Sequence, residues 1–281
     1  MDWVAYSVNE QICITEMFSF FELECDSSYE FPGETHNFWE CVYVLSGAIC
    51  VSTDEKVYDL REGDIIFHKP LELHKFYATD DNTRLLIFSY SAEGNLSKYL
   101  KKSVYSLSAG QKNILSNTLS YAREKAGELN VDTNIHTTYL APFEIIPLYS
   151  QMITTYLHSL MLSIIENSTS ISVSTSYDSL LFQKAVSFMK ENIRHNPSVE
   201  DIAKHTGAGV STIKRIFNRF SGTSVHKYFL KLKLRESLKE LQSGMSVTAT
   251  AESFGFSSQG YFTNVFKREM GMPPSSAMKK Q

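Results

Sequence analysis

The sequence is poor in the features that mark secreted proteins. It has 4 cysteines in 281 residues, and no two of them form a C-x-x-C pair. A disulfide-dense extracellular scaffold is therefore excluded, and thiols buried among strands in a reducing cytosol are the simplest interpretation. A redox-sensing disulfide is the alternative. The four are Cys13, Cys25, Cys41 and Cys50.

Targeting and membrane segments are also missing from the sequence. The N-terminus lacks a basic segment followed by an apolar core, so no signal peptide is expected. No apolar run reaches the length of about 18 residues that a membrane-spanning helix needs. We therefore expect a cytoplasmic protein.

Patterns typical of enzymes are equally scarce. No Ser-His-Asp or Cys-His set has credible spacing, and no glycine-rich loop that would hold a phosphate is present. The sequence therefore predicts a protein that is not an enzyme, and a metal-dependent activity is the alternative considered below.

Charge is unevenly distributed along the chain. Residues 1–170 contain 11 Lys+Arg and 23 Asp+Glu, whereas residues 171–281 contain 16 and 8. An acidic half joined to a basic half indicates that only the second half meets nucleic acid. The length and a hydrophobic content of 43% suffice for two domains with cores of their own.

An internal repeat occupies residues 199–271. In each copy a small residue stands one helical turn before a glycine, Ala203 before Gly207 and Ala251 before Gly255. Such an alanine suits close helix packing, and such a glycine ends a helix because it tolerates positive φ. A second helix with inward apolar residues and a basic end follows in each copy. This is the pattern of a helix-turn-helix, whose second helix enters the DNA major groove.

Polar residues at the start of each second helix are expected to cap it. They are Ser211 and Thr212 in the first copy, and Ser257, Ser258 and Gln259 in the second.

The segment Gly-Phe-Ser-Ser-Gln-Gly-Tyr-Phe-Thr-Asn-Val-Phe-Lys-Arg, residues 255–268, ends shortly before Gly271-Met272-Pro273-Pro274. It resembles the signature of the AraC/XylS family of transcription regulators, and the resemblance covers roughly the last third of the chain. It implies a sequence-specific regulator that binds double-stranded DNA and a small-molecule effector, with a sugar among the candidates. It also implies a homodimer, and RNA polymerase is a candidate partner.

The resemblance assigns base contacts to the first recognition helix, where arginine can pair bidentately with guanine. Because Gly260 has no side chain to offer in the second helix, we expect the first unit to dominate specificity. Arg219, Lys267 and Arg268 are predicted to contact phosphates. A solvated helix face is the alternative for each residue. The predicted DNA-binding residues are Ser211, Thr212, Lys214, Arg215, Asn218, Arg219, Ser258, Gln259, Thr263, Asn264, Lys267 and Arg268.

Residues 11 to about 92 contain short segments rich in β-branched and aromatic residues, separated by turns, which predicts an all-β sandwich or barrel. The segments from His36 to Gly47 and from Gly63 to His74 resemble the two half-motifs of the cupin family. The fold class expected is α+β with two domains: an N-terminal cupin-like jelly-roll β barrel with a helical arm, and a C-terminal all-α double helix-turn-helix.

In this barrel we predict an effector pocket that is apolar with a few polar groups. Metal-binding cupins, by resemblance, would place ligands at Glu34 or His36, then Glu40 and His74, with His68 as a substitute. Because Glu34 stands where the first histidine is usual, the set is incomplete, and no metal or cofactor is expected. The predicted effector-binding residues are His36, Phe38, Trp39, Glu40, Tyr43, His68 and His74, with Phe67 and Phe76 also lining the pocket. A cupin metalloenzyme fused to a DNA-binding module, and an effector-independent DNA binder, are the alternatives.

The domains expected are a sensor barrel over 1–95, a helical dimerisation arm over 96–166, a linker over 167–176 and the DNA-binding domain over 177–281. Helices are expected over 108–129, 148–166 and 178–194, the last capped by Asp178 or Ser179, and a connecting helix over 224–241. The apolar stripe of the second helix is wider than packing on a barrel requires, which favours a dimer interface over simple barrel cover. It consists of Ile153, Tyr156, Leu157, Leu160, Met161 and Ile164.

Overall fold

The computed structural model describes residues 4–7, 11–94, 96–100, 102–129, 140–167 and 169–278. The chain divides into two compact units, one of residues 1–51 and 58–173, the other of residues 52–57 and 174–281. Part of the predicted linker, at residue 168, lies outside the described residues. No helix in the described part of the chain is both long and apolar enough to cross a membrane.

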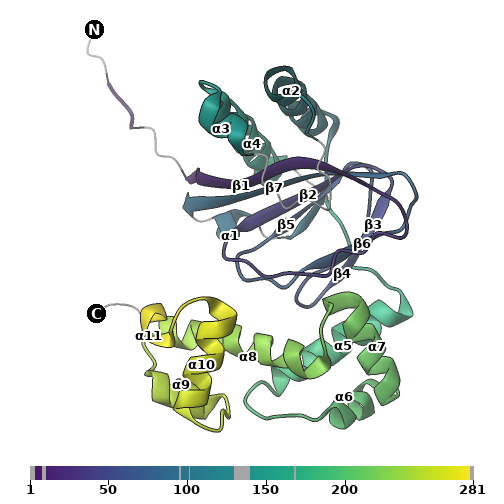
Figure 1. Cartoon of the computed structure of the whole chain (residues 1–281), viewed down its shortest axis with the longest axis vertical. Helices are drawn as coiled ribbons and strands as arrows, with labels where there is room; N and C mark the ends of the chain where they lie inside the picture. The colour runs from purple at the N-terminus through teal and green to yellow at the C-terminus, as the bar shows by residue number, and fades with distance from the viewer. Residues whose placement is uncertain are drawn as a thin grey trace. The chain divides into compact units, whose positions relative to one another are not determined.

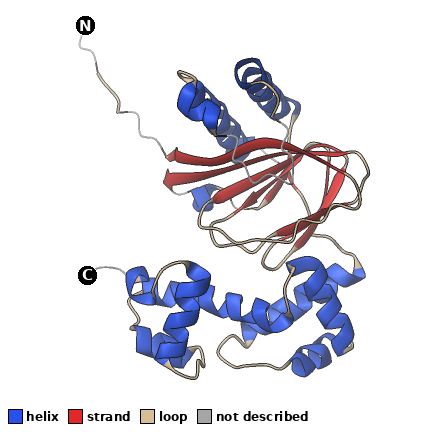
Figure 2. Ribbon diagram, in the orientation of Figure 1, coloured by secondary structure: helices blue, strands red, loops and turns tan. Residues whose placement is uncertain are grey.

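The first unit is built on two sheets, the larger of which is antiparallel (Figures 1 and 2). One has the strand order β1-β7-β2-β5-β8-β9 and the other the order β4-β3-β6. This two-layered, strand-rich unit is the cupin-like fold that the sequence predicts. The strands are β1 (Ile12–Cys25), β2 (Trp39–Ser46), β3 (Ala48–Ser52), β4 (Val57–Arg61), β5 (Asp64–His68), β6 (Lys75–Ala78), β7 (Thr83–Gly94), β8 (Val104–Ser106) and β9 (Thr169–Ser170).

Strand β2 lies between β5 and β7 and divides its side chains between two cores. Alternate side chains of a strand point to opposite faces of the sheet. Val42 and Val44 therefore join residues of β3, β4 and β6 in the core between the two sheets. Cys41 and Tyr43 face the other way, into a core shared with the helices.

The helices of this unit are α1 (Leu96–Tyr99), α2 (Ala109–Ala126), α3 (Ala141–Ile145) and α4 (Tyr149–Asn167). The helices α2, α3 and α4 lie on the same side of the larger sheet (Figure 1). Ser108 caps α2 through a capping box with Gln111, which satisfies amide groups that the first turn leaves unpaired.

Five of the six residues in the predicted apolar stripe of α4 are buried in the core of its own unit, and Tyr156 is half-buried. For those five residues this corrects the prediction that part of the stripe lies away from the barrel. Ile153, Leu157 and Leu160 have 0% exposure, because α4 packs against α2, α3 and β1. The width of the stripe reflects these three neighbours. The large apolar side chain that α4 exposes within its described residues is Leu162, at 51%. The five buried side chains are therefore not available as a dimer interface in this fold, and dimerisation stays a prediction.

The second unit is all-helical. Helix α8 runs between the group α5–α7 and the group α9–α11 (Figure 1), as the double helix-turn-helix prediction requires. The helices are α5 (Tyr177–Glu191), α6 (Val199–Thr206), α7 (Val210–Ser221), α8 (Val225–Gln242), α9 (Val247–Ser253), α10 (Gln259–Met270) and α11 (Pro274–Ala277). Gly207 follows α6 and Gly255 follows α9, the first helices of the two helix-turn-helix motifs, and both glycines have positive φ, as expected.

The caps of two helices differ from the prediction. Helix α5 is capped by Ser176, whose side chain accepts a hydrogen bond from the Ser179 amide, and Asp178 lies within its first turn. Helix α7 begins after Gly209, so Ser211 lies inside it and does not cap it. In α10 the cap is Ser258, as predicted.

Candidate ligand cluster and nucleic-acid interface

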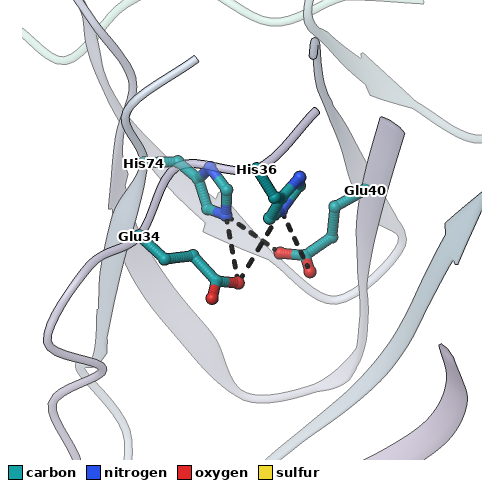
Figure 3. A group of neighbouring side chains, drawn as sticks. All are labelled: Glu34, His36, Glu40 and His74. Atoms are coloured by element: carbon teal, nitrogen blue, oxygen red, sulfur yellow. Dashed lines mark ion pairs between the residues drawn. The ribbon is translucent and has the colours of Figure 1, made fainter. Parts of the chain in front are cut away.

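Four ionisable side chains of the barrel converge on one point (Figure 3). Glu34, His36, Glu40 and His74 each offer one ligand atom, and these atoms all lie within 4.8 Å of one another. Nε2 of His74 is 3.2 Å from Oε1 of Glu40, and Nε2 of His36 is 3.7 Å from Oε2 of Glu40. Oε1 of Glu34 lies 3.7 Å from both Nε2 atoms.

Backbone pairing brings these residues together from distant parts of the sequence. Glu34 and His74 form an isolated antiparallel bridge, in which each amide donates to the other's carbonyl at 3.0 and 3.1 Å. Glu40 lies on β2 opposite Ser89 of β7, whose hydroxyl donates to the Glu40 carboxylate at 3.1 Å. The cluster is thus held by strand pairing, and loop geometry alone does not determine it.

Both histidines present the same ring nitrogen to the cluster. Nδ1 of His36 is 3.0 Å from the Phe38 carbonyl, and Nδ1 of His74 is 3.1 Å from the Glu72 carbonyl. Because a carbonyl can only accept, the Nδ1 atoms carry hydrogen, and Nε2 is the atom directed at the carboxylates. A backbone partner at the second nitrogen is the usual support of a metal-ligating histidine.

Charge in the cluster is strongly coupled. Burial alone would lower the pKa of His74, but the adjacent carboxylates of Glu34 and Glu40 outweigh it and raise the pKa to about 10. Burial would raise the pKa of Glu40, but the adjacent imidazoles of His36 and His74 hold that pKa well below its usual range. The cluster thus pairs cationic imidazole with carboxylate, unless another cation takes the place of the proton.

The donor set fits a divalent metal ion. Two imidazole nitrogens and two carboxylate oxygens are ligands that zinc, iron and manganese accept. The sequence prediction regarded the set as incomplete because Glu34 replaces a histidine. In the structure the Glu34 carboxylate itself completes a set of four. His68 is not part of this set: it stacks on His74 with ring centroids 4.2 Å apart, and its Nδ1 is 3.0 Å from Oε2 of Glu72.

The aromatic residues predicted to line one effector pocket lie in different parts of the first unit. Phe38 stacks on His36 with ring centroids 3.9 Å apart, so it lies beside the cluster. Trp39 and Tyr43 are buried in the core between the sheet and the helices, because they alternate along β2 with the residues that face the barrel interior. Phe67 lies in that same core, and Phe76 in the core between the sheets. The structure therefore does not bring Trp39 or Tyr43 to the cluster.

The predicted DNA-binding side chains of the second unit face solvent. In α7 the apolar residues Ile213, Ile216 and Phe217 have 0% exposure. The exposed positions of α7 are Ser211, Lys214, Arg215, Asn218 and Arg219, with Thr212 half-buried. In and beside α10 the exposed positions are Ser258, Gln259, Asn264, Lys267 and Arg268, with Thr263 half-buried.

Several of these side chains already have partners within the unit: Arg215 and Arg219 pair with Asp178, Arg268 with Glu269, and Gln259 with Thr248. Arg215 donates to Asp178 through Nη1 and Nη2, at 2.8 and 2.9 Å. The Thr248 hydroxyl donates to Oε1 of Gln259 at 2.7 Å. Sequence analysis proposed Asp178 only as a helix cap and regarded Glu34 as a departure from a ligand pattern. No local pattern signals the role of Asp178, because Arg215 lies 37 residues away in the sequence.

Two family models match the chain: a helix-turn-helix domain over residues 202–280 and a cupin domain over residues 26–90. The HTH-type transcriptional activator AarP of Providencia stuartii is 29% identical over 102 residues, 36% of this chain and 76% of AarP. The virulence regulon transcriptional activator VirF of Yersinia enterocolitica is 33% identical over 91 residues, 32% of this chain and 34% of VirF. The HTH-type transcriptional activator RhaR of Shigella dysenteriae is 21% identical over 257 residues, 90% of this chain and 88% of RhaR.

Among solved structures, an AraC-type transcriptional regulator from Chromobacterium violaceum covers 35% of this chain and 88% of its own, with 29% identity and a TM-score of 0.34. ToxT from Vibrio cholerae O395 covers 95% of this chain and 96% of its own, with 16% identity and a TM-score of 0.37. These scores are too low to support a conclusion.

The chain thus combines a cupin domain with a helix-turn-helix domain of the AraC type, and its relatives are transcriptional activators. This is the domain arrangement of AraC/XylS-type transcription regulators.

Proposed function

We propose that this chain regulates transcription by reading a specific double-stranded DNA sequence with α7 and α10, under the control of a ligand bound at the Glu34–His36–Glu40–His74 cluster. The observation that carries the DNA half of the proposal is the pair of helices whose apolar faces are buried and whose polar, basic faces are exposed. Recognition helices of helix-turn-helix proteins present such a face to the major groove.

The spacing of the two helix-turn-helix units supports readout of one duplex by both. Helix α8, which joins them, has 18 residues and is therefore about 27 Å long. That length helps to separate the recognition helices by about one turn of B-DNA, roughly 34 Å. We assign the larger share of specificity to α7, because Gly260 leaves the start of α10 without a side chain at one exposed position.

The ligand half of the proposal rests on the free energy needed to bury the charged groups of the cluster. Glu40 and His74 are 8% and 1% exposed, and three other ionisable groups surround each of them. Buried charged groups seldom contribute net stability even when they are paired, and they cluster at functional sites. A ligand-binding role accounts for their placement better than barrel stability does.

We further propose that the ligand is a divalent metal ion, which revises the expectation from the sequence. Nε2 of His36 and His74 and the carboxylates of Glu34 and Glu40 would hold it, replacing the proton of His74 as the positive charge. A sugar is less well supported, since Trp39 and Tyr43, whose rings would stack on it, are buried in the other core.

Selection from a randomised duplex library with the full chain tests the DNA half. We expect one enriched motif, and Arg215→Ala should remove the preference at one of its positions. A library that emerges unenriched would contradict sequence-specific binding.

Thermal melting with added Zn²⁺ tests the ligand half, since a ligand bound only by the native state raises the melting temperature. Wild type should bind Zn²⁺ stoichiometrically by elemental analysis and melt higher with it. His74→Ala should lose both effects, while His226→Ala, an exposed histidine of α8, should keep them. Zn²⁺ binding that survives His74→Ala would contradict the metal assignment. Steady turnover of a substrate by the Zn²⁺-loaded chain would favour the cupin metalloenzyme alternative.

A homodimer and contact with RNA polymerase complete the proposal. The resemblance to AraC/XylS regulators motivates both, and the dimer would use surface other than the buried residues of the α4 stripe. Sedimentation of the full chain at tens of micromolar tests the dimer, and a monomer at that concentration would contradict it.

A further inference from the structure

Asp178 is the acidic residue that lies against the predicted base-reading arginine. It occupies the first turn of α5 and its side chain is 17% exposed, whereas those of Arg215 and Arg219 are 55% and 46% exposed. Arg215 donates from Nη1 to Oδ2 and from Nη2 to Oδ1, and Arg219 donates from Nη1 to Oδ2 at 3.2 Å. One carboxylate thus holds two arginines one turn apart on α7.

These ion pairs are not needed to hold α5 against α7. Phe182 of α5 packs on Phe217 and Phe220 of α7, with ring centroids 5.1 and 5.4 Å apart, and its side chain is fully buried. Ion pairs of half-exposed arginines contribute little to stability beside such a core. The carboxylate at residue 178 therefore calls for another role.

The geometry of the pair leaves one edge of Arg215 available. A guanidinium has five N–H donors in a rigid fork, and the contact with Asp178 is made at the Nη1–Nη2 end. The edge formed by Nε and the adjacent Nη hydrogen remains, and this edge can still donate bidentately to guanine O6 and N7. Asp178 can therefore fix the plane of the guanidinium without occupying all of its donors.

The negative charge also acts on DNA directly. A carboxylate beside the recognition helix repels the phosphate backbone and offsets part of the positive charge that draws any duplex to α7. Such a repulsive element raises discrimination, because it penalises wrong sites that lack the compensating base contact.

We propose that Asp178 is a positioning residue for DNA readout: it orients Arg215 toward one guanine and limits sequence-independent binding through α7. This inference rests on the proposed DNA-binding function. It predicts a coupling between Asp178 and Arg215 that is seen at a single base-pair position.

The experiment uses the full chain, a selected duplex and a scrambled duplex. Asp178→Asn keeps the shape of the side chain and removes its charge. We expect tighter binding to the scrambled duplex, a plot of log K against log salt that is steeper by up to about 0.9, and a loss of about 5-fold or more in the base preference at the position that Arg215→Ala identifies. Asp178→Glu should restore the salt slope.

Two controls separate this role from a structural one. Glu200→Gln removes an exposed charge from α6 of the same unit and should leave the base preference unchanged. In an Arg215→Ala background, Asp178→Asn should no longer change the preference at that position, since the two effects are coupled.

Failures of the two proposals give different results. A wild type that selects no motif would overturn the proposed function. A wild type with a motif whose preference at the Arg215 position survives Asp178→Asn would overturn the role of Asp178 alone. A variant that discriminates better than wild type would also overturn it, because Asp178 would then act as a competitor of DNA.

Discussion

Replacing Leu160 with alanine tests whether the apolar stripe of α4 is core. The Leu160 side chain has 0% exposure and lies in the core formed by α2, α4 and the larger sheet. Truncation of such a buried leucine costs about 2–5 kcal/mol, because it loses transfer free energy and leaves a cavity. For a unit of this size each kcal/mol lowers the melting temperature by about 2–4 °C. A cost of about 3 kcal/mol therefore predicts a fall of roughly 6–12 °C.

Leu162 is the matched control, since it lies on the same helix but is 51% exposed. Leu162→Ala should change the free energy of unfolding by no more than about 0.5 kcal/mol. Scanning calorimetry of the full chain measures both variants in the transition of the first unit. Equal shifts for the two variants, or a Leu160→Ala chain that melts like wild type but has lost a dimer, would refute the packing of α4 described above.

The remaining predictions concern the second unit. Arg215→Ala should relax base preference at one position, whereas Lys267→Ala should weaken binding to all duplexes alike; competition assays with single-base variants decide, and equal sequence-independent losses would remove Arg215 from base readout. Gly260→Ala should stabilise the unit by about 0.4–1 kcal/mol in denaturant unfolding, because an added Cβ would lie no closer than 4.0 Å to Ser258 Oγ; a loss of stability would show that the backbone there requires glycine. Burial lowers the pKa of Lys233 from 10.5 to about 8, so the unfolded chain binds this proton more tightly and stability should rise as the pH increases from 8 to 10.5. The stability of Lys233→Met should rise less over this pH range than that of wild type. Identical profiles of stability against pH would contradict the lowered pKa of Lys233.

The organisation of the second unit could be predicted because its signals are local. Gly207 and Gly255 end helices through their own backbone freedom, and the buried faces of α7 and α10 follow from helical periodicity alone. The strands of the barrel could also be predicted locally, because runs of β-branched residues and the turns between them mark each strand.

The parts that escaped prediction depend on which elements meet. The alternation of side chains along a strand shows that Tyr43 and Val42 face opposite ways. It does not show which of the two faces the helices and which faces the second sheet, because that depends on where the helices pack. The breadth of the stripe around Leu160 has the same cause, since α4 packs against α2, α3 and β1. The contacts of Glu34 with His74 and of Asp178 with Arg215 join residues far apart in the sequence, where no spacing rule applies.

The most direct test of the central claim joins the two proposed sites in one measurement. Fluorescence anisotropy gives the dissociation constant of the full chain for the selected duplex, once with Zn²⁺ and once with a chelator. An allosteric coupling of ordinary size, about 1–3 kcal/mol, predicts a change of about 5- to 150-fold in wild type and none in His74→Ala. An unchanged constant in a wild type that demonstrably holds Zn²⁺ would contradict control of DNA binding by the cluster.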